Sequence, residues 1–203
     1  LNKKGAEWIQ IDEPILVKNQ NTDFIKLIKK TLNQLKKFAG LSKIILTTYF
    51  EKLDSDIEKE VLSSDVDGVH FDLIRSKISN IDTLKNSNKT ISIGIVDGRN
   101  IWKSDVNKKI EQVAEYAKNI KDLWIAPSCS LLHTPYDLEL EMNVPDKIRK
   151  WLSFAKQKLI ELNHVKISLN KGNNEIKSYL DENEKDIISR KKSEGCCMES
   201  FKE

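Results

Sequence analysis

The chain has 203 residues, of which 34 are basic and 31 acidic, and its formal net charge is +3. A charged fraction of 32% beside 39% hydrophobic residues excludes a disordered chain, and the length suits one domain or slightly more. The basic residues are spread along the chain, which argues against a nucleic-acid partner, and no apolar run approaches the ~20 residues that span a membrane.

The chain begins at Leu1 with neither an initiator methionine nor an apolar signal region, so we interpret it as part of a longer protein. Its three cysteines suit neither a disulfide framework nor a C-x-x-C zinc motif, because Cys129 lies far from the adjacent pair Cys196 and Cys197. This use of cysteine predicts a reducing, cytoplasmic setting.

Five short apolar runs of strand length recur along the chain, and polar residues end each run. The runs cover residues 8–11, 44–46, 69–72, 91–96 and 123–126. Each gap between two runs is long enough to hold a helix. The alternation predicts an α/β fold in which helices cover a parallel sheet.

Residues with helical periodicity occupy several of these gaps and the region after the last run. A first stripe lies within residues 24–35 and is followed by Gly40, and a second covers residues 110–117, with Ser104 as its expected N-cap. A third stripe, residues 148–162, predicts one long helix. The highly charged residues 173–192 predict a solvent-facing helix.

The polar residues at the strand ends are candidate site residues, because ligands of parallel α/β folds bind at the carboxyl ends of the strands. The candidates are Asp12, Glu13, His70, Asp72, Asp97, Arg99, Cys129 and His133. The alternative is that these residues form turns and helix caps, a buried hydrogen-bonded pair (His70 and Asp72), or an internal ion pair (Asp97 and Arg99). For Cys129, the alternative is a small buried hydrophobe.

Several of these segments resemble the cobalamin-independent methionine synthase family, whose activity is 5-methyltetrahydropteroyltriglutamate–homocysteine methyl transfer. The matching segments are Trp-Ile-Gln-Ile-Asp-Glu-Pro at 8–14, Leu-Thr-Thr-Tyr-Phe-Glu at 46–51, Val-Asp-Gly-Arg-Asn-Ile-Trp at 96–102 and Ala-Pro-Ser-Cys-Ser-Leu-Leu-His-Thr-Pro at 126–135. The resemblance covers about residues 5–162.

The resemblance implies a long chain with two (βα)8 barrels, of which residues 1–165 match strands four to eight of the N-terminal barrel. Residues 166–192 would be a charged C-terminal helix and residues 193–203 a flexible tail. The intact enzyme would transfer a methyl group from methyltetrahydrofolate polyglutamate to homocysteine, using zinc held in the other barrel. This part would be structural and folate-side, with the missing barrel parts as partners and no catalytic residue of its own.

The likeness between the two barrels of the family also implies that this part binds no zinc. The positions that match the zinc ligands of the catalytic barrel are Leu46, Thr48, Asp72 and Cys129. Leucine cannot bind a metal and threonine binds it poorly, so two ligands of four remain. A zinc methyltransferase that uses Asp72, Cys129 and a histidine is a weaker alternative.

The other alternative is a self-standing α/β binding module, for instance a flavodoxin-like sheet. Strand order separates the two folds, because a doubly wound sheet reverses direction at a switch point and a barrel segment keeps sequential neighbours. For a barrel segment, we expect residues 8–12 and 123–126 to be unpaired edges, and we expect Leu46 and Asp72 to share the concave face.

Overall fold

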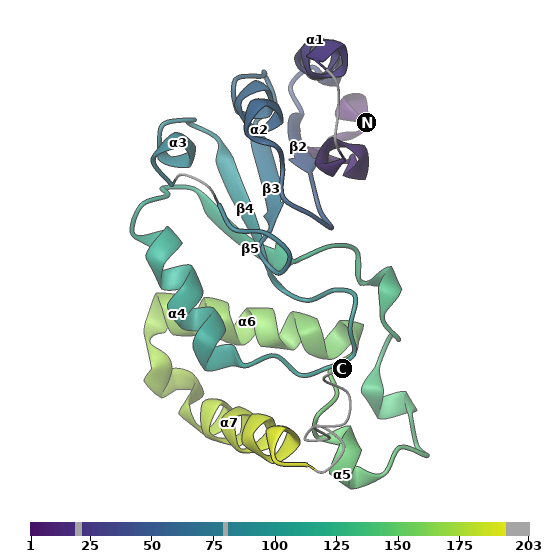
Figure 1. Cartoon of the computed structure of the whole chain (residues 1–203), viewed down its shortest axis with the longest axis vertical. Coiled ribbons are helices and arrows are strands. Elements are labelled where there is room, and N and C mark those ends of the chain that lie inside the picture. The colour runs from purple at the N-terminus through teal and green to yellow at the C-terminus, as the bar shows by residue number, and fades with distance from the viewer. Residues whose placement is uncertain (19–21, 79–80, 194–203) are drawn as a thin grey trace, which may run out of the picture. The chain divides into compact units, whose positions relative to one another are not determined.

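A computed structural model describes residues 1–18, 22–78 and 81–193 (Figure 1). The chain divides into two compact units. Unit 1 consists of Leu1–Ile95 and Glu115–Cys129, and unit 2 consists of Val96–Ala114 and Ser130–Glu203. The tail that carries Cys196 and Cys197 lies outside the described residues.

Unit 1 contains a five-stranded sheet in which every strand lies beside its sequence neighbours. The strands are β1 (Trp8–Asp12), β2 (Lys43–Thr47), β3 (Gly68–Asp72), β4 (Thr90–Val96) and β5 (Leu123–Pro127), and their order in the sheet is β1-β2-β3-β4-β5. The pairs from β1 to β4 are parallel. All five predicted strands are confirmed, and their order lacks the reversal expected of a flavodoxin-like sheet.

The remaining elements are helices of very different lengths. The α-helices are α1 (Thr22–Ala39), α2 (Ser55–Leu62), α3 (Ile81–Lys85), α4 (Val106–Ala117), α5 (Asp146–Arg149), α6 (Ala155–Lys171) and α7 (Lys177–Lys191). Short 3-10 helices are η1 (Asn2–Lys4), η2 (Pro14–Val17), η3 (Leu131–His133), η4 (Leu138–Leu140) and η5 (Asn173–Ile176). Among the described residues, no helix is both long and apolar enough to cross a membrane.

The first predicted helix is confirmed as α1, which Gly40 follows with a φ of +62°. The second is confirmed as α4, but its expected cap was wrong. Asp105, and not Ser104, caps α4, since its Oδ1 accepts a hydrogen bond from the N–H of Lys108 at 3.3 Å.

The prediction of one long helix over residues 148–162 was also wrong. A non-helical stretch between α5 and α6 interrupts the stripe. Leu152 forms an antiparallel bridge with Trp102, and Ser153 donates its N–H to the carbonyl of Ile101 at 2.8 Å. This long-range pairing occupies the backbone groups that a continuous helix would need. In addition, α6 continues to Lys171, past the expected boundary at residue 165.

The two faces of the sheet differ in chemistry. Ile11 pairs with Leu46, and both line an apolar hollow of about 320 Å³ together with residues of α1, so they lie on the helix-covered face. Thr47 pairs with His70 on the opposite face, which we call the inner face, and Asp72 shares that face. The expectation that Leu46 and Asp72 share a face was therefore wrong, because residues alternate along each strand and the register fixes the alternation across strands.

The helix-covered face of the sheet is apolar and the inner face is largely polar, although both are buried in the central strands. The buried apolar residues on the helix-covered face are Ile44, Leu46, Val69, Phe71, Ile91, Ile93 and Ile95. The buried polar residues on the inner face are Thr47, His70, Asp72, Thr90 and Ser92. Burial of polar groups is costly unless they are hydrogen-bonded, so the inner face requires a specific network of bonds.

The edge strands β1 and β5 are more exposed than the central strands, as expected for the two ends of the sheet order. The starts of these two strands nevertheless approach each other, since the rings of Trp8 and Trp124 pack edge to face with centroids 4.8 Å apart. Lys43 lies over the Trp8 ring at 5.1 Å. Contact between rings from opposite edges requires a strongly curled sheet, so the edges are less open than the sequence suggested.

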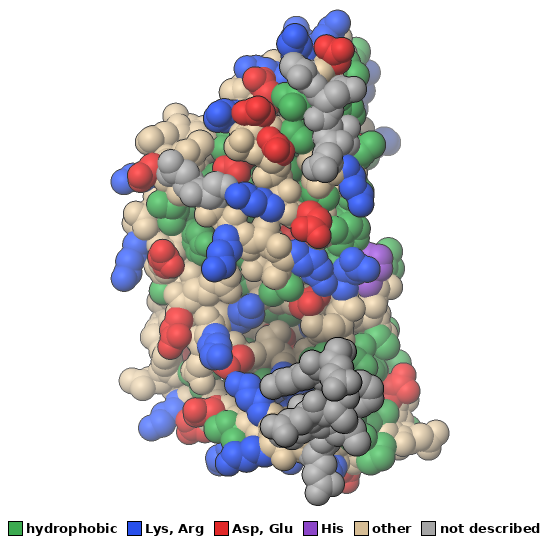
Figure 2. All heavy atoms as spheres, in the orientation of Figure 1, with side chains coloured by type: hydrophobic (Ala, Val, Ile, Leu, Met, Phe, Trp, Pro, Cys, Tyr) green, Lys and Arg blue, Asp and Glu red, His purple; other side chains and the backbone are tan. Residues whose placement is uncertain are grey.

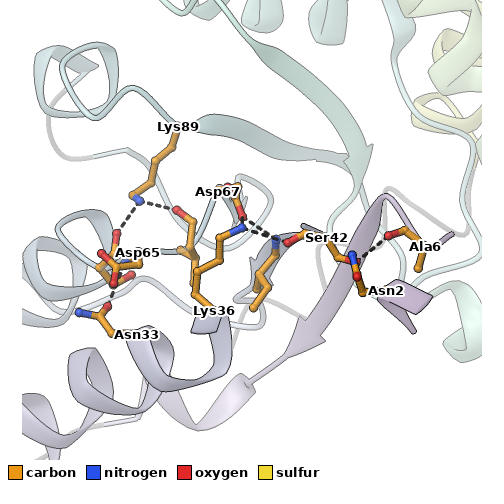
Figure 3. Close-up of polar contacts among 11 residues, drawn as sticks. Asn2, Ala6, Asn33, Lys36, Ser42, Asp65, Asp67 and Lys89 are labelled. Carbon is orange, nitrogen blue, oxygen red and sulfur yellow. Dashed lines mark hydrogen bonds and ion pairs between the residues drawn. The ribbon is translucent and has the colours of Figure 1, made fainter. Parts of the chain in front are cut away.

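A polar network joins the amino ends of β2, β3 and β4 through Asp67 (Figure 3). The carboxylate of Asp67 accepts the N–H of Ile44 at 2.7 Å and pairs with Lys36 of α1 at 2.8 Å. Its backbone N–H donates to the carbonyl of Ile44 at 2.9 Å, and its carbonyl accepts the N–H of Thr90 at 3.0 Å. One residue therefore fixes the starts of three strands and the position of α1.

Further bonds extend this network to the chain that precedes β1. Lys36 also donates to the carbonyl of Ser42 at 3.0 Å, and the hydroxyl of Ser42 donates to the carbonyl of Ala6 at 2.6 Å. Lys89 donates to the carbonyls of Ser64 and Val66 at 2.8 and 2.5 Å.

Basic and acidic side chains are interspersed over the face seen in Figure 2, as the small net charge suggests.

We expect Asp67→Ala to lower the free energy of unfolding by about 1–3 kcal/mol, because it leaves the N–H of the buried Ile44 without an acceptor and removes the partner of Lys36. Urea denaturation followed by tryptophan fluorescence measures the change. Asp65→Ala is the matched control, since the side chain of Asp65 is exposed and only its backbone N–H bonds to Asn33. Equal stability of the two variants would contradict the role of Asp67.

Candidate functional site

The carboxyl ends of the strands in unit 1 bring Asp12 and Cys129 close to Tyr49. The phenol of Tyr49 donates to Oδ2 of Asp12 at 3.4 Å, and Oδ1 of Asp12 accepts a bond from the amide of Gln10 at 2.7 Å. Burial raises the pKa of Tyr49, and the charges of Asp12, Cys129 and Glu13 raise it further. Tyr49 was not among the sequence candidates, although its position just after β2 is a signal that could have identified it.

The adjacent carboxylates Asp12 and Glu13 have different roles, as expected for neighbouring residues at a strand end. Asp12 is exposed and contacts Tyr49, whereas Oε1 of Glu13 accepts the N–H of Ile15 at 3.1 Å and caps η2. For Glu13, the turn-forming alternative therefore describes the observed contact.

Asp72 organises the loops that follow β2 and β3. It is 1% exposed, and its carboxylate accepts N–H bonds from Phe50 at 3.1 Å, Ile74 at 2.9 Å and Arg75 at 3.1 Å. The guanidinium of Arg75 lies 3.6 Å away. Phe50 has a φ of +85°, a left-handed conformation that is costly for a bulky residue, and the bond to Asp72 helps to hold it there.

His70 is 4% exposed and is hydrogen-bonded within the inner face of the sheet. Its Nε2 lies 3.4 Å from the carbonyl of Ser128, and its Nδ1 lies 2.9 Å from the hydroxyl of Ser92. A carbonyl can only accept, so Nε2 carries the proton and Nδ1 of the neutral ring accepts from Ser92. Burial lowers the pKa of His70, although the Ser128 carbonyl and the charges of Asp72 and Asp12 oppose this shift. The structural alternative expected a hydrogen-bonded pair of His70 and Asp72. Both residues are buried, but the bonds observed for His70 are to Ser92 and Ser128.

Gly94 on β4 allows the backbone of β5 to approach this histidine. A Cβ atom at Gly94 would lie 2.5 Å from the Cα of Ser128 and 3.0 Å from Nε2 of His70. The first distance is shorter than real Cβ contacts and the second is tighter than most of them, so a side chain here would push β4 away from the loop that follows β5. The loop that carries Cys129 can lie close to β4 because Gly94 has no side chain.

The residues that match the zinc ligands of the family do not fit a zinc ion. Leu46 is apolar and lies on the helix-covered face, and the hydroxyl of Thr48 donates to the carbonyl of His70 at 2.7 Å. Asp72 is bonded to three backbone N–H groups, and Cys129 is 6% exposed. Within the described part of the chain, no group of three or more His, Cys, Asp or Glu residues could hold a metal ion. A tetrahedral zinc site needs four converging ligands, which these residues do not supply.

The other three candidates, Asp97, Arg99 and His133, belong to unit 2. The carboxylate of Asp97 accepts the backbone N–H of Arg99 at 2.8 Å and the side-chain amide of Asn100 at 2.9 Å, which closes a turn directly after β4. Arg99 is exposed on this turn, and His133 is exposed at the end of η3.

Comparison with known proteins gives a consistent assignment. The family described as cobalamin-independent synthase, N-terminal domain, matches residues 1–121. A 5-methyltetrahydropteroyltriglutamate–homocysteine methyltransferase of Pasteurella multocida (strain Pm70) is 40% identical over 183 residues, which is 88% of this chain and 24% of the relative. The protein of the same name from Coxiella burnetii (strain CbuG_Q212) is 39% identical over 196 residues, which is 95% of this chain and 25% of the relative.

The chain belongs to the cobalamin-independent synthase family, and the resemblance seen in its sequence is confirmed. It spans about a quarter of the length of the curated relatives that it matches.

We expect the free energy of unfolding to decrease as the pH falls below about 6.5, the ordinary pKa of histidine, because the unfolded chain then binds a proton that buried His70 resists. His70→Gln keeps a donor and an acceptor but does not titrate, so its stability should depend less on pH. Urea denaturation between pH 5 and 8 measures the dependence. The matched control is His133→Gln, which changes an exposed ring; if it alters the pH dependence as strongly as His70→Gln, the assignment to His70 is wrong.

Proposed function

We propose that this chain is the later part of the N-terminal barrel of a cobalamin-independent methionine synthase, comprising strands four to eight. The observation that carries the proposal is the sequential order of five strands in a chain that is 40% identical to a named methyltransferase. Under this proposal residues 1–165 belong to the barrel and residues 166–192 include the charged C-terminal helix, observed as α7. The expected tail lies outside the described residues, apart from Ser193.

The parent enzyme would transfer the methyl group of 5-methyltetrahydropteroyltriglutamate to homocysteine, as the names of the relatives state for those proteins. Zinc, which would activate the homocysteine thiol, would be held outside this chain, since the residues here do not fit it. We assign this part a structural and folate-side role. Asp12 and Tyr49 offer a carboxylate and a phenol for N–H groups of a ligand.

The remainder of the parent chain would be the principal partner, and an apolar groove supports this. The hollow between β1, η2 and α1 is lined mainly by apolar side chains, among which Leu27 is 55% and Ile15 45% exposed. β1 is the first strand in the sheet order, so its outer edge has no partner strand among the described residues. A helix that follows a parallel strand at this edge would pack beside α1 and cover these side chains.

We expect the isolated chain to form no methionine from homocysteine and methyltetrahydropteroyltriglutamate and to retain no zinc after dialysis, because it lacks a thiolate-rich metal site. Methionine analysis and metal analysis test both points, with the intact Coxiella burnetii relative as the positive control. One tightly held zinc per chain that is lost in Cys129→Ser would contradict the proposal and favour a zinc methyltransferase.

A chimera tests the positive part of the proposal. In the Pasteurella multocida relative, the segment that matches this chain is replaced by the chain itself. We expect the chimera to form methionine, because the segment should fit the same place in the parent. If the chimera is folded, as judged by circular dichroism, but inactive, the proposed role is wrong.

A further inference from the structure

The segment from Ile101 to Val106, which leads from the Arg99 turn into α4, is held mainly by side chains of distant helices. Apart from the carbonyl of Ile101 and the N–H of Lys103, which pair with the stretch around Trp151 and Ser153, its bonded backbone groups are satisfied by polar side chains. An extended segment that lies outside a sheet needs such partners when it is buried.

The helix α7 supplies the largest share of these partners. Asn183, 2% exposed, accepts the N–H of Val106 at 3.1 Å through Oδ1 and donates to the carbonyl of Ser104 at 2.9 Å through Nδ2. Asp186 pairs with the ammonium group of Lys103 at 2.7 Å. One amide side chain thus satisfies the first N–H of α4 and a carbonyl of the segment before it.

Arg190 continues the same row on α7, one turn beyond Asp186. Its guanidinium donates to the carbonyls of Lys103 at 3.1 Å and Trp151 at 3.2 Å and lies 5.5 Å from the ring centre of Trp102. Asn183, Asp186 and Arg190 are spaced by three and four residues, so they lie on one face of the helix. This face points at the segment, although the sequence predicted a solvent-facing helix.

The helix α6 connects the segment to the Arg99 turn. The ammonium group of Lys158, whose side chain is fully buried, lies 3.3 Å from the carbonyl of Trp102 and 3.4 Å from Oδ1 of Asn100. Asn100 in turn donates to the carboxylate of Asp97, which closes the turn. Bonds therefore run from α7 and α6 through the segment to the turn that presents Arg99.

We propose that α7 is a clamp whose residues Asn183 and Arg190 position the segment 101–106 and, through it, the turn that presents Arg99. Both are positioning residues, because they act on the turn through other groups. The inference goes beyond the proposed methyltransferase role and holds for unit 2 whatever ligand Arg99 meets. Under this proposal the charged helix α7 positions the cation of Arg99 on the turn directly after β4.

Asn183→Ala in the full chain tests the clamp by hydrogen exchange of individual amides, observed by NMR. We expect exchange of the amides of residues 101–106 to become about tenfold faster or more, because the N–H of Val106 and the carbonyl of Ser104 lose their partners. Amides of β2 and β3 should exchange as before. The matched control is Glu184→Ala, which changes an exposed neighbour on the same helix.

Two further variants decide the case if Asn183→Ala does not fold. Asn183→Asp keeps the acceptor for Val106 and loses the donor to Ser104, so we expect the Val106 amide to remain protected. Arg190→Met keeps the length of the side chain, and we expect faster exchange at 101–104 and altered Trp102 fluorescence. Unchanged exchange in all the variants, or an equal increase throughout the chain, would refute the clamp.

Discussion

The carboxylate of Asp67 aligns the amino ends of β2, β3 and β4 and ties them to α1 through Lys36. β2 and β3 have only five residues each, so an error at one end would carry through to the other. A slip of one residue would turn His70 and Asp72 from the inner face toward the helices. The arrangement of polar groups at the carboxyl ends therefore depends on a bond at the amino ends, where a ligand would not be expected.

The inner face shows how a parallel sheet can bury polar groups on a side that is usually apolar. His70, Ser92 and Ser128 satisfy one another, and Gly94 leaves the room for their approach. The carboxylate of Asp72 accepts backbone N–H groups from two loops and stabilises the left-handed conformation of Phe50. Of these residues, Asp72 is the one whose position the resemblance matches to a zinc ligand, and its hydrogen bonds shape the loops instead.

Unit 2 follows a different principle, because charged and amide side chains of α6 and α7 hold a segment that no strand accompanies. Lys158 and Glu161 of α6 are 0% and 2% exposed, and Asn183 and Asp186 of α7 are also buried. Buried charges are tolerated when they are bonded. Lys158 meets the carbonyl of Trp102, Glu161 accepts the N–H of Ser104, and Asp186 pairs with Lys103. The low apolar content of α7 is thus explained by what it binds.

The sequence by itself determined the five strands, the parallel α/β class, the helices α1 and α4 and the family, because each depends on local periodicity or on contiguous motifs. It also identified most strand-end residues, since turn chemistry is local. The tertiary structure alone decided that Leu46 faces the helices, that Leu152 pairs with Trp102 and breaks the third helical stripe, and that Asn183 faces the segment before α4. Register, long-range bridges and the partners of buried polar groups join residues far apart in the chain, so no local pattern encodes them.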